Sequence, residues 1–448
     1  MASRSGIAGL VAAVASAASL APGVVAADAG GRANGRYEVW AIDQSNSPGR
    51  TYGGTLYVWD GEKLANGSSV DAPETVDLGG PAAAACLAAT GANPVRPHMV
   101  AFNAEHTHAV VSFVASGHVL LLDAATREAR ACVRTSPGAG GARQAHFAAP
   151  SPDGAYVVVA NQNGKLLERV DVDYAANTFA LNPAATIDLA SCTTPNGAAC
   201  QDAALRPDNA PICPVVEATS RHTFVTLRGG GMFVVDSAAT PMRIVAEYDR
   251  ATVHPNGCGG AEVPARRHGP GKMYVNSGGG TGPNLFEADL YAFPVTGFSA
   301  ANPPNTPAPS VVLSEDVEGA DAHGVVLTKH GRELWMADRG RNLLWVVDTA
   351  TDQLVDRLPL AGDVSADPTP DILAVAPPGN HVFASLRGPN PLTADPHVST
   401  GSTPGVGVLR VVKGGHGAQF ELVARVSNVD AGGVERADVH ALAVRSTG

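Results

Sequence analysis

Five polar residues of this 448-residue chain stand at the start of apolar segments, and their types are those of metal ligands. Neutral imidazoles suit Cu, Zn, Ni or Fe, and one carboxylate among several histidines is a common ligand set. Imidazoles gathered in a small volume repel one another when protonated, so they need a group that ligates or neutralises them. We predict a metal site wherever the fold brings these residues together: His98, His146, His323, Asp371 and His440.

The elements that must position these residues form a repeat. Each unit has a head residue, an apolar strand, a turn, a second strand, and a third strand that ends in Asp. The segment "HGVVLTKHGRELWMADRGRNLLWVVDTAT" begins at His323 and ends its third strand at Asp348, the place that Asp123 takes in the copy from His98. The period of roughly 40 to 50 residues is typical of propeller blades. Further copies begin at His146 and, more weakly, near Ile212, Cys258 and Asp371.

A seventh unit is divided between the two ends of the chain. The sequence ends with a lone first strand, "DVHALAVRS", and the missing strands are supplied by "YEVWAIDQ", "GGTLYVWDG" and "ETVDLGG" near the amino terminus. A blade made from both ends pairs the two open edges of the ring. We therefore predict an all-β, seven-bladed β-propeller whose last blade is closed by N- and C-terminal strands, forming a single domain over residues 28–448.

The heads should form a ring, because the first strand of each blade lines the central channel. Four blades share one register without gaps, since the middle of the second strand follows the head by 12 residues in the pairs His98 and Val110, His146 and Val158, His323 and Trp335, and Asp371 and Phe383.

His440 heads the divided blade, and the two remaining heads are Ile212 or Cys213 and Cys258 or Gly259. The polar heads belong to contiguous blades, so they should occupy one side of the channel. Acidic residues two positions before two of the histidines suit an orienting role, and arginines near two others suit an anionic ligand. The acidic residues are Asp321 and Asp438, and the arginines are Arg96 and Arg143.

Composition narrows the class of protein. Residues 1–27 have a positive start, an apolar Ala-rich run and small residues at a cleavage position, which predicts a signal peptide and an exported, periplasmic or extracellular protein. No later run approaches the roughly 18 apolar residues of a membrane span. The net charge of −11 argues against nucleic acid or an anionic membrane as partner. A small molecule remains as substrate or ligand.

Six cysteines in an exported chain predict three disulfides. Cys192 and Cys200 flank a turn-rich loop and are expected to form one of these disulfides. Proximity in the repeat then pairs Cys86 with Cys132 and Cys213 with Cys258. A metal-thiolate site is the competing interpretation, but no CxxC spacing supports it.

The motif "LWMADRGRNLLWVVDTAT" resembles the YVTN-type β-propeller repeat, and the resemblance covers nearly all of residues 28–448. The chain is similar to the histidine-rich propellers of nitrous-oxide reductase and thiocyanate dehydrogenase, which build copper sites at the heads of inner strands. The resemblance implies a copper site, with zinc or another divalent metal as alternative, and redox chemistry on a small molecule. It assigns the ligand role by position to His98, His146, His323, Asp371 and His440. Unlike nitrous-oxide reductase, this chain lacks an appended cupredoxin domain.

Three alternatives stay open. The head histidines can be copied structural residues that hydrogen-bond to the neighbouring blade. The chain can also be a non-catalytic binding or surface protein, or a lactonase-type hydrolase, although Asp371 is the only carboxylate in the ring. Weaker candidates are His254 and His268 at the channel mouth, and Glu217 and Glu262 as acid/base groups. Four tryptophans are expected in the core: Trp40, Trp59, Trp335 and Trp345. The sequence leaves substrate, metal identity and oligomeric state undetermined.

Overall fold

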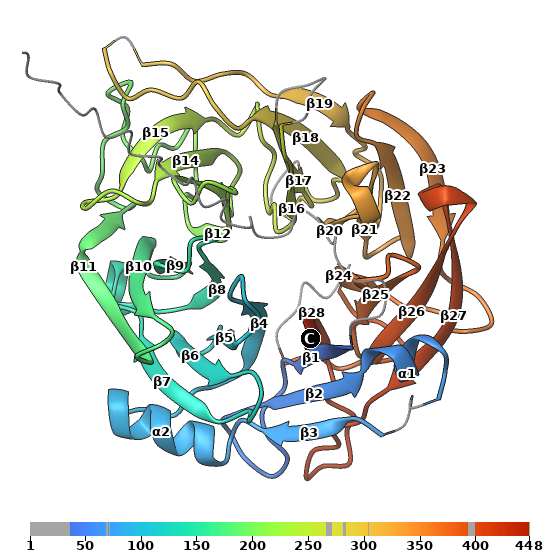
Figure 1. Ribbon diagram of the computed structural model, residues 1–448. Coiled ribbons are helices and arrows are strands. Elements are labelled where there is room, and N and C mark those ends of the chain that lie inside the picture. Colours follow the sequence, from blue (N-terminus) through green and yellow to red (C-terminus); the bar gives the residue numbers. More distant parts are fainter. Residues whose placement is uncertain are drawn as a thin grey trace, which may run out of the picture.

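A computed structural model describes residues 36–68, 70, 72–265, 271–280, 284–302, 304–392 and 399–447. Those residues form seven four-stranded antiparallel sheets arranged as a ring, one sheet per blade (Figure 1). The predicted seven-bladed propeller is therefore confirmed. The predicted signal peptide, residues 1–27, and His268 lie outside the described residues.

We number the blades in chain order from residue 97, and the blade that contains both ends is blade 7. Blade 1 consists of β4 (Pro97–Phe102), β5 (His108–Phe113), β6 (His118–Asp123) and β7 (Ala129–Arg134), and blade 2 of β8 (Ala145–Pro150), β9 (Tyr156–Asn161), β10 (Leu166–Asp173) and β11 (Thr178–Asp188). Blade 3 consists of β12 (Pro211–Val216), β13 (His222–Leu227), β14 (Met232–Asp236) and β15 (Arg243–Tyr248), and blade 4 of β16 (Gly260–Val263), β17 (Lys272–Ser277), β18 (Asp289–Pro294) and β19 (Ser310–Leu313). Blade 5 consists of β20 (Ala322–Leu327), β21 (Glu333–Asp338), β22 (Leu343–Asp348) and β23 (Gln353–Pro359), and blade 6 of β24 (Pro370–Val375), β25 (His381–Leu386), β26 (Gly405–Val412) and β27 (Gly417–Arg425).

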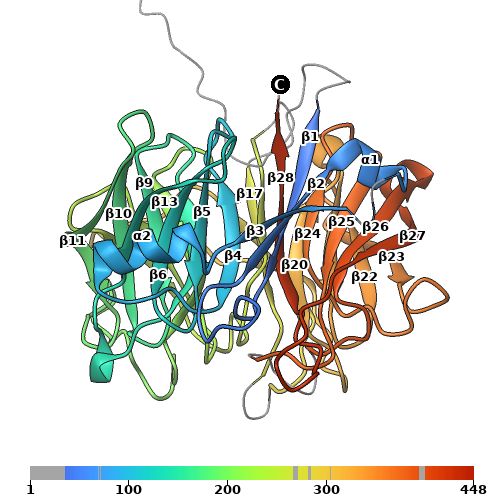
Figure 2. The ribbon, with the colours of Figure 1, turned by 90° about the horizontal axis from the view of Figure 1, so that it is seen from below.

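Blade 7 closes the ring as predicted, in the strand order β28 (Val439–Ser446), β1 (Tyr37–Asp43), β2 (Thr55–Asp60), β3 (Glu74–Asp77). β28 pairs antiparallel with β1, with Trp40 opposite Ala443. Figure 2 shows β28 between the inner strands of other blades in the middle of the disc. The helical segments lie outside the sheets: α1 (Gly61–Ala65), α2 (Pro81–Thr90), and the 3-10 turns η1 (Ala139–Gly141), η2 (Lys329–Gly331) and η3 (Lys413–Gly415). Among the described residues, no helix has the length and apolar character needed to cross a membrane.

Every blade has four strands, which confirms the four segments predicted for the divided blade and corrects the three predicted for each of the other units. The missed strand is the outer one, which carries polar residues on a largely exposed edge. In β23, for example, the sequence is QLVDRLP and no residue is fully buried. An apolar-run criterion does not detect such a strand, because only part of one face contacts the neighbouring sheet.

The predicted register is confirmed. In each of five blades the residue three positions after the head pairs with the residue 12 positions after it: Ala101 with Val110, Ala149 with Val158, Val215 with Phe224, Val326 with Trp335, and Ala374 with Phe383. In blade 4 the corresponding pair is Ala261 and Tyr274, separated by a longer hairpin.

The core lies between blades rather than in one central mass. The four tryptophans are each at most 1% exposed, which confirms that they are core residues: Trp40, Trp59, Trp335 and Trp345. The three disulfides also join as predicted, Cys86 to Cys132, Cys192 to Cys200 and Cys213 to Cys258.

Close contact between inner strands explains why glycine follows one head. A Cβ added at Gly324 would lie 2.2 Å from the carbonyl oxygen of Asp371 in the next blade. We expect Gly324→Ala to destabilise the protein by about 1–3 kcal/mol, the usual cost of overpacking. Gly362→Ala is the control, because no atom lies within 4 Å of its added Cβ. Chemical unfolding measures both, and equal stability of the two variants would contradict tight inner-strand packing.

His118 is a buried histidine outside the channel, enclosed beneath α2. Its Nε2 lies 2.9 Å from Thr90 Oγ1, and its Nδ1 lies 2.9 Å from Ser116 Oγ. Burial, with a contribution from Arg134, lowers the pKa of His118 to about 4. In the unfolded chain His118 becomes protonated as pH falls below about 6.5, whereas in the folded chain it becomes protonated only near pH 4.

We expect His118 to lose its stabilising contribution as pH falls from 6.5 towards 4, by at most about 1.4 kcal/mol per pH unit. The measurement is the difference in unfolding free energy between wild type and His118→Gln at pH 7 and at pH 4.5. Other titrating groups cancel in this difference. The wild-type advantage should shrink at pH 4.5, and an unchanged difference would show that His118 accepts a proton in the folded state.

Candidate functional site

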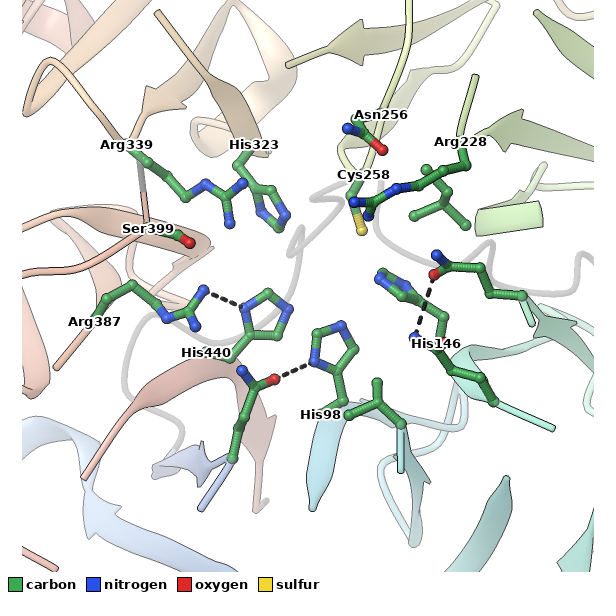
Figure 3. Close-up of a pocket in the computed structure, with 15 residues that line it drawn as sticks. His98, His146, Arg228, Asn256, Cys258, His323, Arg339, Arg387, Ser399 and His440 are labelled. Carbon is green, nitrogen blue, oxygen red and sulfur yellow. Dashed lines mark hydrogen bonds between the residues drawn. The ribbon is translucent and has the colours of Figure 1, made fainter. Parts of the chain in front are cut away.

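The predicted head residues meet at one mouth of the channel. His98, His146, His323, Asp371 and His440 are each the second residue of an inner strand. At each of these positions the pairing with the second strand shifts register, which is a β-bulge. Bulges re-aim side chains and are common next to functional sites. Figure 3 shows the four imidazoles pointing into a shared space from four strands.

The imidazoles contact one another directly. His98 and His440 stack with ring centroids 3.9 Å apart and planes 14° apart. His146 meets His98 edge-on at 4.4 Å, and His323 meets His440 edge-on at 5.4 Å. His98, His323 and His440 are buried, and His146 is partly exposed. The prediction that these histidines come together from distant parts of the chain is thus confirmed.

The Nδ1 atoms of two imidazoles are held by neighbouring side chains. His98 Nδ1 lies 2.5 Å from Gln44 Oε1, and the other amide atom of Gln44 donates to Asp438 at 3.1 Å. Because an amide oxygen only accepts, His98 carries its proton on Nδ1. His440 Nδ1 lies 2.6 Å from Asp371 Oδ2 and 3.5 Å from Arg387 Nη1 (Figure 3), and the much shorter contact with the carboxylate selects the same tautomer. In both rings Nε2 is therefore the atom with the free lone pair.

No hydrogen-bond donor in the described part of the chain satisfies these lone pairs. The Nε2 atoms of His98 and His440 are buried and have no hydrogen-bond partner among the described residues. Buried polar atoms are almost always paired, and an exception requires an explanation such as a ligand. An imidazole whose Nδ1–H is anchored by a carboxylate or carbonyl, with Nε2 free, has the arrangement of a metal ligand.

Asp371 lies behind the imidazoles, fully buried, and joins several of these groups. Its Oδ1 is 2.7 Å from His323 Nδ1, although the angle is outside hydrogen-bond geometry, and its Oδ2 accepts from Arg387 at 2.9 Å. Arg339 Nη1 lies 3.5 Å from Oδ1. Asp371 is not among the described residues that line the cavity.

The arginines around Asp371 are themselves neutralised. Arg387 binds Asp438 with two hydrogen bonds of 2.6 and 2.8 Å, and Arg339 donates to Asp321 at 2.7 Å. The sequence-based expectation that Asp321 and Asp438 orient the histidines is therefore corrected, since these carboxylates hold arginines. The orienting groups are Gln44 and Asp371.

Burial lowers the pKa of all four imidazoles, to about 4 for His323. Neighbouring imidazoles and arginines add to this effect for His98 and His146. Burial would raise the pKa of Asp371, but the adjacent cationic groups outweigh it and hold the pKa well below its usual range. The site at neutral pH therefore presents uncharged imidazoles in front of an ionised carboxylate.

Sequence reasoning missed a second ring of residues, each directly after the second strand of its blade. In all seven blades, the backbone N–H of this residue donates to the carbonyl of the residue two positions before the head, at 2.9 to 3.3 Å. In five blades this residue follows the head by 16 positions, as Val114 follows His98, so the spacing in the sequence was a usable signal. The members that line the cavity are Gln44, Val114, Gln162, Arg228, Arg339 and Arg387.

The cavity enclosed by the two rings has a volume of about 220 Å³. Pockets for drug-sized ligands are larger, roughly 300–1,000 Å³, so this cavity suits a small ligand. Its far side is formed by Ile212 and Cys258, two of the residues expected as heads on blades 3 and 4. The alternative head on blade 3, Cys213, places its Sγ 3.7 Å from His146 Nδ1. Arg96 and Arg143, expected near an anion, instead donate to the backbone carbonyls of Leu392 and Thr135.

The hydrogen bonds that join neighbouring blades at the head residues do not depend on the histidine side chains. Blades are joined by hydrogen bonds at the heads, but the acceptor is the backbone carbonyl of the head residue. Ser112 donates to His146 O at 3.0 Å, and Ser385 donates to His440 O at 2.6 Å. Any residue supplies a carbonyl, so this blade-to-blade hydrogen bond does not require histidine.

At the ring there are two groups of three residues, and within each group one candidate ligand atom per residue lies within 4.8 Å of the other two. One is His146 with Cys213 and Cys258, but the two sulfurs are bonded to each other and are not thiolates. The other is His323, Asp371 and His440. The weaker candidates Glu217 and Glu262 accept backbone N–H groups, of Thr219 and Ala218.

This chain is similar to several solved structures over nearly their whole length. A periplasmic gluconolactonase from Pseudomonas aeruginosa is 14% identical, with 92% of this chain and 100% of that chain covered and a TM-score of 0.55. A putative 6-phosphogluconolactonase from Bacteroides fragilis is 11% identical, with 92% and 99% covered and a TM-score of 0.53. A protein from Lactobacillus plantarum is 11% identical, with 91% and 99% covered and a TM-score of 0.54.

At such low identity the likeness shows the fold alone. No protein-family model matches the sequence, and no curated protein matches it. The residues of the site must therefore carry the functional argument.

Proposed function

We propose that the channel imidazoles bind a copper-class metal and that this site supports redox chemistry on a small molecule. The observation that carries the proposal is the pair of buried, unpartnered Nε2 atoms on His98 and His440, whose Nδ1 atoms are anchored by Gln44 and Asp371. His146 and His323 complete an all-nitrogen donor set of the kind that copper, zinc, nickel and iron accept.

The free lone pairs favour the channel side of the imidazoles over the side that faces Asp371. A cation among His323, Asp371 and His440 would face the guanidinium groups of Arg339 and Arg387. Arg339 and Arg387 also line the cavity, but on that side the unpartnered Nε2 atoms of His98 and His440 are available to bind a cation. We therefore propose that Asp371 orients His440 and His323, while direct ligation by Asp371 stays a prediction from sequence.

Copper would supply one-electron redox chemistry when bound. The chain's own residues hold the imidazoles neutral by burial, fix the tautomers of His98 and His440, and restrict the cavity to small ligands. The three disulfides support an oxidising compartment, so export from the cytoplasm is part of the proposal.

Metal loading tests the proposal. Purified protein would be stripped with a chelator, loaded with Cu²⁺ or Zn²⁺, dialysed and analysed for bound metal. We expect at least one copper per chain. Sub-stoichiometric copper and zinc after loading would contradict the proposal and favour a non-catalytic binding or surface protein.

A hydrolase, such as a lactonase, is the second candidate, favoured by the contact between His440 and Asp371. A histidine with Nδ1–H on a carboxylate and Nε2 facing a cavity has the geometry of a general base. Hydrolysis of lactones by the chelator-treated protein, lost in Asp371→Asn, would support this candidate. Absence of hydrolysis across a lactone panel would dispose of it.

A further inference from the structure

A second cluster of metal-ligating side chains lies in blade 4, separate from the imidazole ring. It consists of His254, in the loop between β15 and β16, and Glu287 and Asp289, where β18 begins. Their candidate ligand atoms all lie within 4.8 Å of one another. We propose that these three residues form a binding site for a single divalent cation. This inference does not depend on the proposed function, because the two sites share no residue.

The two carboxylates are almost completely buried. Glu287 is 1% exposed and Asp289 is 0% exposed, whereas His254 is 29% exposed at its side chain. Burying an ionised carboxylate is costly unless it is fully paired. Two such groups side by side require either a cation or a proton to offset their mutual repulsion.

The donors found among the described residues reach only half of the carboxylate oxygens. His254 Nδ1 is 2.8 Å from Asp289 Oδ2 and 3.4 Å from Glu287 Oε1. Tyr291 donates to the same Asp289 oxygen at 3.0 Å, and Asn284 donates to the same Glu287 oxygen at 2.6 Å.

The other two oxygens, Glu287 Oε2 and Asp289 Oδ1, are buried and have no hydrogen-bond partner among the described residues. Each carboxylate therefore has one oxygen held by the protein and one left for a ligand. Glu287 and Asp289 are two positions apart where β18 begins, and each offers a ligand atom within 4.8 Å of the other, so we propose that their free oxygens serve the same ligand.

His254 does not satisfy the two free oxygens. Its Nδ1 atom faces Asp289 Oδ2 and Glu287 Oε1, the two oxygens that Tyr291 and Asn284 also reach. The nearby cation Arg250 donates to Asn284 Oδ1 at 3.1 Å rather than to either carboxylate.

The donor set indicates the class of cation. Carboxylate oxygens suit Mg²⁺, Ca²⁺ and Mn²⁺, and a single imidazole shifts the preference towards transition metals. Mn²⁺ accepts both kinds of donor and is the appropriate probe. The site also has a structural consequence, because the loop that carries His254 continues to Asn256 and Cys258, which line the channel cavity. A cation here would fix that loop against β18.

Mn²⁺ titration of chelator-treated protein, followed by electron paramagnetic resonance of the free ion, tests the proposal. We expect one Mn²⁺ per chain in wild type and in the double variant His98→Ala, His440→Ala. Asp289→Asn and Glu287→Gln should each weaken binding by at least about 100-fold, the upper end of losses seen when an outer-shell partner is removed.

The matched control is His416→Ala. His416 Nε2 is 3.4 Å from Glu333 Oε1, but Glu333 Oε2 accepts from Thr328 at 2.8 Å, so this pair offers no free oxygen. Binding should be unchanged in this variant. No Mn²⁺ binding by wild type at about 1 mM, the weak limit of specific sites, would overturn the proposal even where a variant fails to fold. Mn²⁺ binding that survives both carboxylate substitutions would overturn it as well.

Discussion

Replacing His98 or His440 by alanine is expected to weaken copper binding by at least about 100-fold, while the propeller still folds. Loss of a residue that merely orients a ligand costs roughly 10- to 100-fold, so loss of a ligand should cost at least the upper value. Both imidazoles present an Nε2 atom that lacks a partner among the described residues. Competition with a chromophoric chelator measures the affinities, and circular dichroism checks the fold.

Two further variants separate ligands from orienting residues. Gln44→Leu and Asp371→Asn should weaken copper binding by about 10- to 100-fold, because they disturb the Nδ1–H anchors without removing an imidazole. His381→Ala is the control, since His381 lies on the second strand of blade 6 and faces Glu421. Copper affinity that is equal in His98→Ala, His440→Ala and His381→Ala would contradict the proposed metal site.

Arg387→Met is expected to reduce the free energy of unfolding by about 3–5 kcal/mol, the cost of leaving buried charges without a partner. The Arg387 side chain is 2% exposed and binds Asp438 with two hydrogen bonds and Asp371 with one. Removal of its charge leaves two fully buried carboxylates facing each other across the contact between blades 6 and 7. Urea unfolding at pH 7 measures the change.

The control is Arg410→Met, which removes an exposed ion pair with Glu421 and should cost less than about 1 kcal/mol. Arg387 joins blade 6 to blade 7, the blade that contains both ends of the chain. We therefore expect the ring of Arg387→Met to open at this contact at a lower urea concentration than the ring of wild type. A cost for Arg387→Met as small as that for Arg410→Met would show that the carboxylates are protonated or solvated in the folded protein.

The sequence predicted the ring of heads because one register is repeated. The constant interval from His98 to Val110 and from His323 to Trp335 reflects one hairpin geometry, and equivalent positions in a closed disc must face the same axis. The same logic would have found Arg339 and Arg387, which keep a constant interval from their heads. They were missed because they follow an apolar strand and resemble ordinary turn residues.

Other features depend on distances that a repeat does not encode. Gln44 reaches His98 only because blade 7 closes beside blade 1, and the sequence gives no sign of which way its amide points. Asp321 and Asp438 bind arginines because a guanidinium offers two parallel donors to a carboxylate. Proximity in sequence to a histidine does not predict that preference.

Anomalous diffraction at the copper edge from copper-loaded crystals would locate the metal that we place at the channel imidazoles. We expect a peak in the channel about 2.0–2.1 Å from Nε2 of His98 or His440, the distance of metal–imidazole bonds. A peak only among His254, Glu287 and Asp289, or imidazoles left without metal at full copper loading, would contradict this placement.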